Sequence, residues 1–180
     1  MKVVHVNSDY GNTIYKNLSD SLFKLGIEQR VYKFIRPNIM PNLDDYDDYV
    51  DVRLNYGNLD RYFYHIKHNK VAHDFINYCI FHEVDLIHAH TLFSNGYVAY
   101  QAYKRLHIPY IVTVRSTDIQ IFFKYMRHLR KVGREILLNA SKVIFISHAH
   151  KKAVFNKYIP DKYRDYIENK TLVIPNGIDQ

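Results

Sequence analysis

The chain has very little cysteine and no long apolar run, and each shortage excludes a class of protein. Cys79 is the one cysteine in 180 residues, which excludes an internal disulfide framework and suits a reducing compartment. No stretch is apolar enough to span a bilayer, and the N-terminus opens with the strand-like MKVVHV instead of a signal peptide. We therefore expect a cytoplasmic protein.

The composition is that of one folded domain, because 47% of the residues are apolar and 24% are charged. The net charge of +7 is unevenly spread. Five aspartates lie within residues 44–51, whereas residues 124–134 hold five basic side chains and one histidine but no acid. Such a basic stretch is typical of contact with nucleic acid, anionic lipid or a phosphorylated substrate, or of a solvated helix face. No helix-turn-helix, zinc or base-stacking motif accompanies it, so we expect no nucleic acid as a partner.

Apolar periodicity predicts strands that alternate with helices along the chain. The predicted strands cover residues 2–6, 30–35, 85–89, 110–114, 142–146 and 172–174. The predicted helices cover 14–25, 59–82 with or without a break near Asn69, 92–106, 121–139, a short segment from His148 and one more turn within 160–169. Gly26 is placed to end the first helix in a left-handed conformation, and residues 37–57 resemble an irregular loop. This order predicts a doubly wound, Rossmann-like α/β domain with a mostly parallel sheet of about six strands.

Polar residues gather at two strand ends between Asp85 and Asp118. This segment has the pattern of strand, loop, helix, turn, strand and loop, which forms a βαβ unit. His88 and His90 stand at the end of its first strand, and Arg115 to Asp118 follow its second. Because ligands of open parallel sheets bind beyond the carboxyl ends of the strands, we predict a binding site there.

These polar groups have more than one interpretation. The spacing of His88 and His90 suits zinc, but no third ligand with metal spacing stands out. We favour a packed, hydrogen-bonded His88 and a His90 that points into the cleft. Arg115 either clamps a phosphate or pairs with Asp118 in a structural bridge. The aspartates of residues 44–51 lack the glycine-turn spacing of a calcium loop, and we expect no bound metal.

Further candidates lie in other loops. The loop after the first strand contains Tyr10, Gly11 and Asn12. A glycine there lets backbone N–H groups approach an anionic or polyhydroxyl ligand. A simple turn without a ligand is the alternative interpretation of this loop. The loop lacks the G-x-G-x-x-G pattern, which disfavours a dinucleotide cofactor. Ser147 ends a later strand and can cap the helix from His148.

In this order the segments resemble the N-terminal domain of a GT-B glycosyltransferase of family 4, a group of nucleotide-sugar-dependent transferases. The resemblance rests on a glycine loop after the first strand, then DLIHAHT followed by Gly96, IPYIVTV, VIFIS with a lysine beyond it, and VIPNGID. It covers essentially the whole chain.

The resemblance implies that residues 1–174 form an acceptor-side domain, one half of a GT-B fold. Residues 175–180 would begin the linker to a C-terminal domain that binds the nucleotide-sugar. The intact enzyme would transfer a sugar from a nucleoside diphosphate donor to a glycan or lipid-linked acceptor, with retention of configuration and no cofactor, in cell-surface polysaccharide biosynthesis. The 180 residues would be an excised domain or a truncated product, inactive alone. A stand-alone Rossmann-like module that binds a phosphosugar or nucleotide without catalysis is the alternative.

The same resemblance assigns roles to the candidate residues. Arg115 and Asp118 are the catalytic candidates. Substrate contacts are expected from Tyr10, Gly11, Asn12, His90, Ser116, Thr117 and Ser147, and the interdomain hinge from Asn176 and Gly177. Residues 124–134 would rest on anionic lipid, which places the enzyme at the inner face of the membrane.

One position departs from the family pattern. Most members carry a histidine and a glycine where this chain has Arg115 and Ser116, and the chain looks like an Arg-x-Thr-Asp variant of the group. A guanidinium stays charged and cannot shuttle a proton near neutral pH. We expect Arg115 to hold a diphosphate, a carboxylate or a sugar hydroxyl instead.

Overall fold

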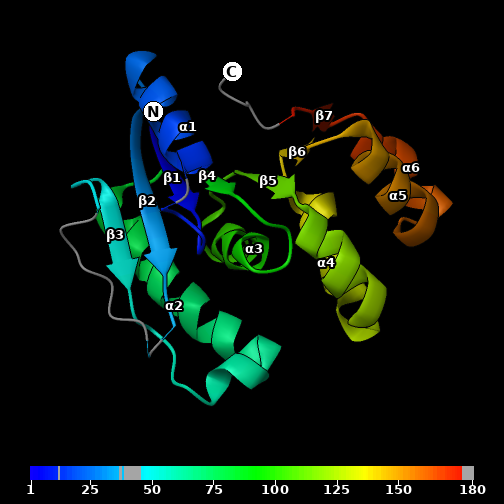
Figure 1. Ribbon diagram of the computed structural model, residues 1–180, viewed down its shortest axis with the longest axis horizontal. Helices are drawn as coiled ribbons and strands as arrows, with labels where there is room; N and C mark the ends of the chain where they lie inside the picture. Colours follow the sequence, from blue (N-terminus) through cyan, green and yellow to red (C-terminus); the bar gives the residue numbers. More distant parts are fainter. Residues whose placement is uncertain (12, 37, 39–45, 176–180) are drawn as a thin grey trace.

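A single parallel sheet forms the centre of the molecule (Figure 1). The computed structural model describes residues 1–11, 13–36, 38 and 46–175, with the side chains of residues 13 and 14 left aside. Within these residues the sheet has seven strands in the order β3-β2-β1-β4-β5-β6-β7, all parallel. The strands are β1 Lys2–Val6, β2 Glu28–Phe34, β3 Val50–Arg53, β4 Leu86–Ala89, β5 Tyr110–Val114, β6 Lys142–Phe145 and β7 Thr171–Val173.

Helices cover the sheet because parallel strands need crossover connections. They are α1 Thr13–Lys24, α2 Tyr64–His82, α3 Asn95–Leu106, α4 Arg130–Asn139, α5 His148–Tyr158 and α6 Asp161–Glu168. Three shorter turns are η2 Asp60–Tyr62, η3 Asp118–Phe123, which is a π-helix, and η4 Arg127–Leu129. The predicted doubly wound α/β class is confirmed.

Alternate residues of the strands serve two separate cores. Val4, Ile87 and Val112 belong to the large core, which also contains buried residues of α2, α3 and α4. Val31 points to the opposite face, where it packs with Tyr15 of α1 in a smaller cluster. The strand order reverses between β1 and β4, and this reversal opens a crevice at the carboxyl edge of such sheets.

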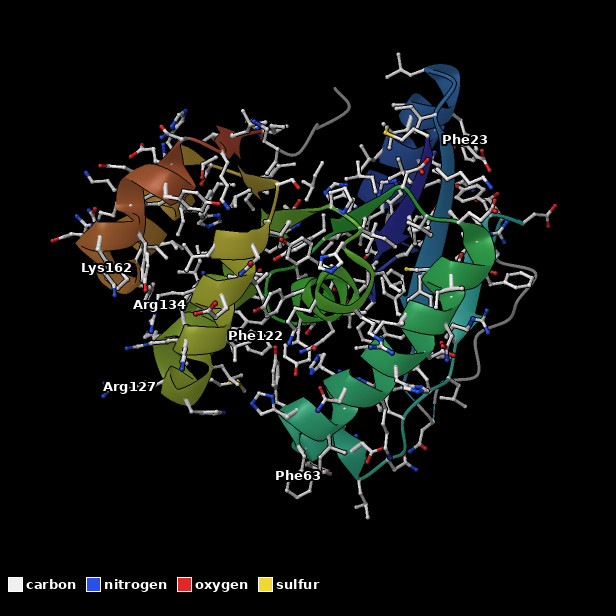
Figure 2. The ribbon with its side chains drawn as sticks, turned by 180° about the vertical axis from the view of Figure 1, so that it is seen from behind. Phe23, Phe63, Phe122, Arg127, Arg134 and Lys162 are labelled. Atoms are coloured by element: carbon white, nitrogen blue, oxygen red, sulfur yellow. The ribbon has the colours of Figure 1, made fainter. Side chains whose placement is uncertain are left out.

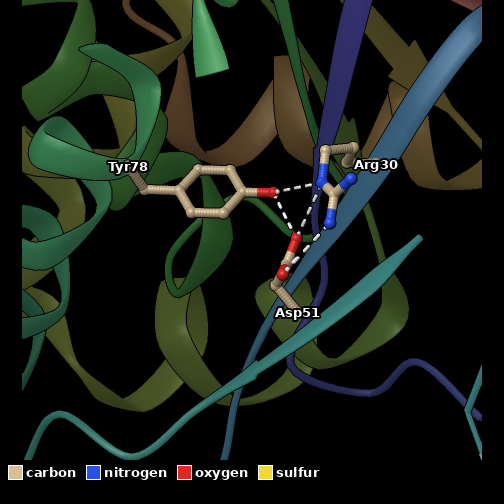
Figure 3. Close-up of polar contacts among 3 residues, drawn as sticks. All are labelled: Arg30, Asp51 and Tyr78. Atoms are coloured by element: carbon tan, nitrogen blue, oxygen red, sulfur yellow. Dashed lines mark hydrogen bonds and ion pairs between the residues drawn. The ribbon is translucent and has the colours of Figure 1, made fainter. Parts of the chain in front are cut away.

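The edge strand β3 lies inside residues 37–57, which the sequence predicted as irregular. That prediction is wrong for Val50–Arg53, so the sheet has one strand more than expected. Arg30 of β2 donates to both carboxylate oxygens of Asp51, over 2.9 and 3.2 Å, and the Tyr78 hydroxyl of α2 donates to the same carboxylate over 2.6 Å (Figure 3). Side chains distant in sequence therefore hold a strand that is too short for a clear alternating pattern.

Two predicted helices have different boundaries in the structure. Helix α2 runs unbroken through Asn69, and the interruption lies at Phe63, between η2 and α2. The predicted helix 121–139 is divided into η3, η4 and α4. Met126 has a non-helical backbone, and Arg130 donates to the carbonyl of Phe123 over 2.7 Å. A side chain thus satisfies a carbonyl that a continuous helix would have bonded internally.

Two glycines stand at positions where the backbone geometry favours the absence of a side chain. Gly26 has φ +72° and ends α1, as predicted. At Gly96, a Cβ atom would lie 3.1 Å from the carbonyl of Thr91 and 3.1 Å from Val112, so the missing side chain lets α3 pack closely on the sheet. None of the helices described is both long and apolar enough to cross a membrane.

Candidate functional site

A cavity of about 520 Å³ opens at the carboxyl edge of the sheet, next to the reversal in strand order. Four strands send residues to its wall. Ser8 and Asp9 follow β1, Arg36 follows β2, Thr91 follows β4 and Thr117 follows β5. Thr117 and Asp118, from the strand ends where a site was predicted, line this cavity, whose size suits a small ligand.

Asp118 joins two loops behind this cavity. One carboxylate oxygen accepts the backbone N–H groups of Leu92 and Arg115, each over 2.9 Å, and the other accepts that of Phe93 over 3.0 Å. Burial raises the pKa of Asp118 to about 6, although these amides and the Arg115 charge oppose the change. With 1% of its surface exposed, Asp118 shapes the loop after β4 more than it presents a carboxylate to solvent.

Arg115 lies half-buried behind the same loop. Its Nε donates to the carbonyl of His90 over 3.3 Å, and its guanidinium lies 5.3 Å from the ring centre of Tyr15. The prediction offered a structural bridge between the Arg115 guanidinium and the Asp118 carboxylate. In the structure, the backbone N–H of Arg115 donates to that carboxylate. Arg115 is not among the described residues that line the cavity.

Three histidines from β1, from β4 and from the residue after β4 form a cluster in which two rings are buried and that of His88 is partly buried. Nδ1 of His5 and Nε2 of His90 share a hydrogen bond of 2.9 Å, and Nε2 of His88 shares one of 3.0 Å with the Thr113 hydroxyl. The expected packing of His88 is confirmed. The expectation that His90 points into the cleft is wrong, because its side chain is 3% exposed and bonds to His5.

The sequence suggested no third ligand beside His88 and His90, whereas the sheet register places His5 directly opposite His88. One ligand nitrogen from each of the three rings lies within 4.8 Å of the others. Burial lowers the pKa of His5 to about 4 and of His88 to about 3. One hydrogen bond joins His5 to His90 and another joins His88 to Thr113, and burial favours the neutral form of the rings.

The loop after β1 contributes differently from the prediction. Tyr10 is buried, with its hydroxyl 2.8 Å from that of Tyr49, and its carbonyl accepts a hydrogen bond from Lys33. Gly11 has φ +121°, and a Cβ atom there would lie 3.6 Å from Nζ of Lys33. Ser8 and Asp9 reach the cavity in their place. Asn12, Asn176 and Gly177 lie outside the described residues.

The remaining predicted residues differ in their access to the cavity. Thr117 is exposed and lines it. Ser116 lies 3.4 Å from Nε2 of His150, and Ser147 accepts the backbone N–H of His150 over 3.2 Å. Ser147 therefore caps α5, as its alternative interpretation predicted.

Sequence reasoning missed three cations that line the cavity, Lys33, Arg36 and Lys67. Lys33 is buried in β2. A lysine within the strand-like run RVYKFI is unusual, and it could have indicated a functional residue from the sequence. Lys33 donates to the Tyr46 hydroxyl over 2.7 Å. Lys67 belongs to α2 and has no local sequence signal that connects it to Lys33.

Residues 11–180 match the sequence profile described as Glycosyltransferase Family 4. The chain belongs to glycosyltransferase family 4. The predicted resemblance is confirmed, while the Arg-x-Thr-Asp variant stays a prediction. An uncharacterised glycosyltransferase of Methanocaldococcus jannaschii is 29% identical over 97 residues, which are 54% of this chain and 25% of that relative.

Solved structures of related fold extend this comparison. Sucrose-phosphate synthase from Thermosynechococcus elongatus has a TM-score of 0.73 and 20% identity, over 99% of this chain and 49% of that one. Anabaena HepE in complex with UDP and glucose has a TM-score of 0.65 and 19% identity, over 99% and 45%. A UDP-GlcNAc 2-epimerase from Methanocaldococcus jannaschii, in complex with UDP-GlcNAc and UDP, has a TM-score of 0.66 and 12% identity, over 98% of this chain and 47% of that one. At these identities the likeness shows a shared Rossmann-like fold, and this family 4 chain spans about half of each of the three.

Proposed function

We propose that this family 4 chain is the acceptor-side domain of a transferase. The enzyme moves a sugar from a nucleoside diphosphate sugar to a glycan or lipid-linked acceptor, with retention of anomeric configuration. The observation that carries the proposal is the cavity at the carboxyl ends of β1, β2, β4 and β5 in a chain of this family. The biosynthesis of cell-surface polysaccharide is the setting that we propose for it.

The donor sugar belongs to a second domain in this proposal. Residues 175–180, with a hinge at Asn176 and Gly177, would lead to it, and closure of the two domains would bring donor and acceptor together. Support comes from the coverage of about half of the solved neighbours, among them proteins in complex with UDP. The 180 residues alone would then have no transferase activity.

The chemistry that we propose is electrostatic stabilisation of the departing diphosphate. Arg115 would supply a permanent positive charge, and the backbone near Gly11 would supply N–H donors. Asp118 would position Arg115 through its bond to the backbone N–H of Arg115. A guanidinium does not exchange its proton near neutral pH, so no step uses Arg115 as an acid or base.

A transfer assay on the protein with its C-terminal continuation tests the proposal. The protein is incubated with radiolabelled nucleoside diphosphate sugars and a panel of glycan and lipid-linked acceptors, and labelled product is separated from donor. We expect product with at least one pair, and none from the 180 residues alone. Binding of a phosphosugar without transfer from any donor would favour the stand-alone binding module.

Membrane contact through residues 124–134 is a further part of the proposal. Lys124, Arg127 and Lys131 are exposed there, beside Tyr125 with 70% of its surface exposed. Phe63 is 60% exposed and directly precedes α2, whose Tyr64 ring contacts Phe122 of η3. In Figure 2, Phe63 and Arg127 both lie toward the lower end of the molecule. Basic and aromatic side chains on adjoining elements favour an anionic lipid surface.

Vesicle sedimentation tests this contact. We expect the protein to pellet with anionic vesicles and to stay in solution with neutral ones. Replacement of Lys124, Arg127 and Lys131 by glutamine should abolish pelleting, whereas glutamine at the exposed Lys152 and Lys157 should not. Equal binding to both vesicle types would contradict a role for the basic segment.

A further inference from the structure

We propose that the cavity binds a phosphate or diphosphate group of the acceptor, and that Lys33, Arg36 and Lys67 recognise it. This inference deepens the proposed function and rests on it. The acceptor class that it names is an anionic sugar phosphate or a lipid-linked phosphate.

The three cations converge on one cavity from two separate segments. Lys33 and Arg36 come from β2 and the residues directly after it, and Lys67 comes from the second turn of α2. Within the described residues no ion pair joins any of the three to an acid. No paired acid in the described part of the chain therefore neutralises the positive charge that they bring to the cavity, and the Lys33 ammonium donates to two neutral groups, the Tyr10 carbonyl and the Tyr46 hydroxyl.

The acids of the cavity wall do little to neutralise this charge. The described lining residues include two carboxylates, Asp9 and Asp118. Both oxygens of Asp118 already accept backbone N–H groups. Among the described lining residues, three cations face two carboxylates, which leaves this part of the wall positive.

Lys67 shows that this arrangement costs free energy in the protein without ligand. Burial lowers the pKa of Lys67, and the nearby charge of Arg36 lowers it further. Its ammonium lies 5.0 Å from the ring centre of Tyr56 and 5.6 Å from that of Phe34, which offers partial compensation. A ligand anion at short range would relieve the repulsion between the cations.

The rest of the wall suits a phosphorylated sugar. The hydroxyls of Ser8, Thr91, Ser94 and Thr117 supply donors for phosphate or sugar oxygens. Aromatic rings of Tyr56 and Phe122 supply apolar surface. The cavity volume of about 520 Å³ lies within the range of small-molecule sites.

Binding measurements without any donor test the inference. Glucose 6-phosphate, inorganic pyrophosphate and glucose are titrated into the protein by calorimetry, and phosphatidylcholine vesicles that carry a polyprenyl phosphate are tested by sedimentation with the variant in which Lys124, Arg127 and Lys131 are glutamine. We expect glucose 6-phosphate to bind at least about tenfold more tightly than glucose, which corresponds to about 1.4 kcal/mol. The stronger of the sugar phosphate and the polyprenyl phosphate identifies the source of the anion.

Two variants assign the binding to the cations. Arg36→Gln and Lys67→Gln should each weaken the binding of glucose 6-phosphate about tenfold, and Arg36 is exposed, so its replacement leaves the fold intact. Lys152→Gln removes the same charge from an exposed position of α5 and should have no effect.

Three results would overturn the inference: equal affinity for glucose and glucose 6-phosphate, equal effects of Lys152→Gln and Arg36→Gln, or displacement of glucose 6-phosphate by UDP. The last would assign the cations to the donor. Anion binding without any sugar transfer would remove the transferase proposal and keep the site. Transfer to a neutral acceptor that Arg36→Gln leaves unchanged would remove the anion site and keep the transferase proposal.

Discussion

The buried carboxylate of Asp118 accepts hydrogen bonds from three backbone N–H groups. Its neighbour Arg115 is held by a carbonyl and an aromatic ring. The two residues were predicted together as catalytic, yet their surroundings differ: one organises a loop, and the other keeps a fixed charge close to it. Substitutions can separate these roles.

Asp118→Asn should destabilise the fold. An amide has one acceptor oxygen, so its NH₂ group would face at least one backbone N–H and leave that donor unsatisfied. We expect a loss of about 1–3 kcal/mol in the free energy of unfolding, measured by urea denaturation. Asp9→Asn removes the same charge from an exposed position and should leave stability unchanged. Equal stability of both variants would show that the amide bonds of Asp118 contribute nothing.

Arg115→Ala in the complete enzyme should lower turnover on the order of 10²-fold, with little change in KM, because the charge acts on the transition state. Arg115→Lys should restore part of the activity. Steady-state kinetics and thermal denaturation are measured on the same samples. Wild-type kinetics with a lowered melting temperature would make Arg115 a structural residue.

Among the secondary-structure elements, η3 and α4 depend most on their surroundings. The stripe of apolar residues from 122 to 136 has helical spacing, yet the chain bends within it so that Phe93 and Phe123 pack against Gly133. A Cβ atom at Gly133 would lie 2.6 Å from Cζ of Phe93. The close packing of α4 against the loop after β4 therefore requires glycine.

Gly133→Ala should destabilise the protein by about 1–3 kcal/mol, since a buried aromatic ring must move. Alanine is the better helix former by about 1 kcal/mol, so a net loss shows that packing dominates. Phe93→Leu shortens the opposing side chain, and in that background Gly133→Ala should cost less. Equal costs in both backgrounds, from denaturation curves, would rule out this contact as the cause.

For the molecule as a whole, acid sensitivity follows from buried neutral histidines. Burial lowers the pKa of His5 to about 4 and of His68 and His88 to about 3, and that of His90 lies well below its ordinary value. In the unfolded chain these rings take up protons below about pH 6.5. Below that pH the unfolded chain binds more protons than the folded protein does, so the free energy of unfolding falls as the pH is lowered toward 4.

The free energy of unfolding should fall between about pH 6.5 and pH 4 by up to about 1.4 kcal/mol per pH unit for each buried histidine. Urea denaturation across this range measures the slope. His5→Gln should reduce the slope, whereas His73→Gln at an exposed position should not. A slope that His5→Gln leaves unchanged would place the acid sensitivity elsewhere.

The local pattern predicted a large part of the fold. Strand boundaries at Lys2–Val6 and Tyr110–Val114 agree residue for residue with the structure, because each is a short, mostly apolar run that a polar residue follows. Gly26 ends α1 as predicted, and Ser147 has the capping role that was its alternative interpretation, since both caps depend on residues next to them in the sequence. The ordered motifs also predicted the family, which the profile match confirms.

The local pattern did not predict contacts between segments that are distant in the sequence. Asp51 became part of a strand through Arg30 and Tyr78, and His90 turned inward to bond with His5. Periodicity reports which face of an element is buried but not what packs against it.

The sequence by itself determined the α/β class, the strand ends that carry polar loops and the membership of family 4. Tertiary structure alone decided which side chains reach the cavity. Lys33 and Lys67 belong to different elements, and they meet because the parallel sheet places the end of β2 beside the start of α2. Charge at the site is a sum over such neighbours, so it follows from the folded arrangement and not from any one segment.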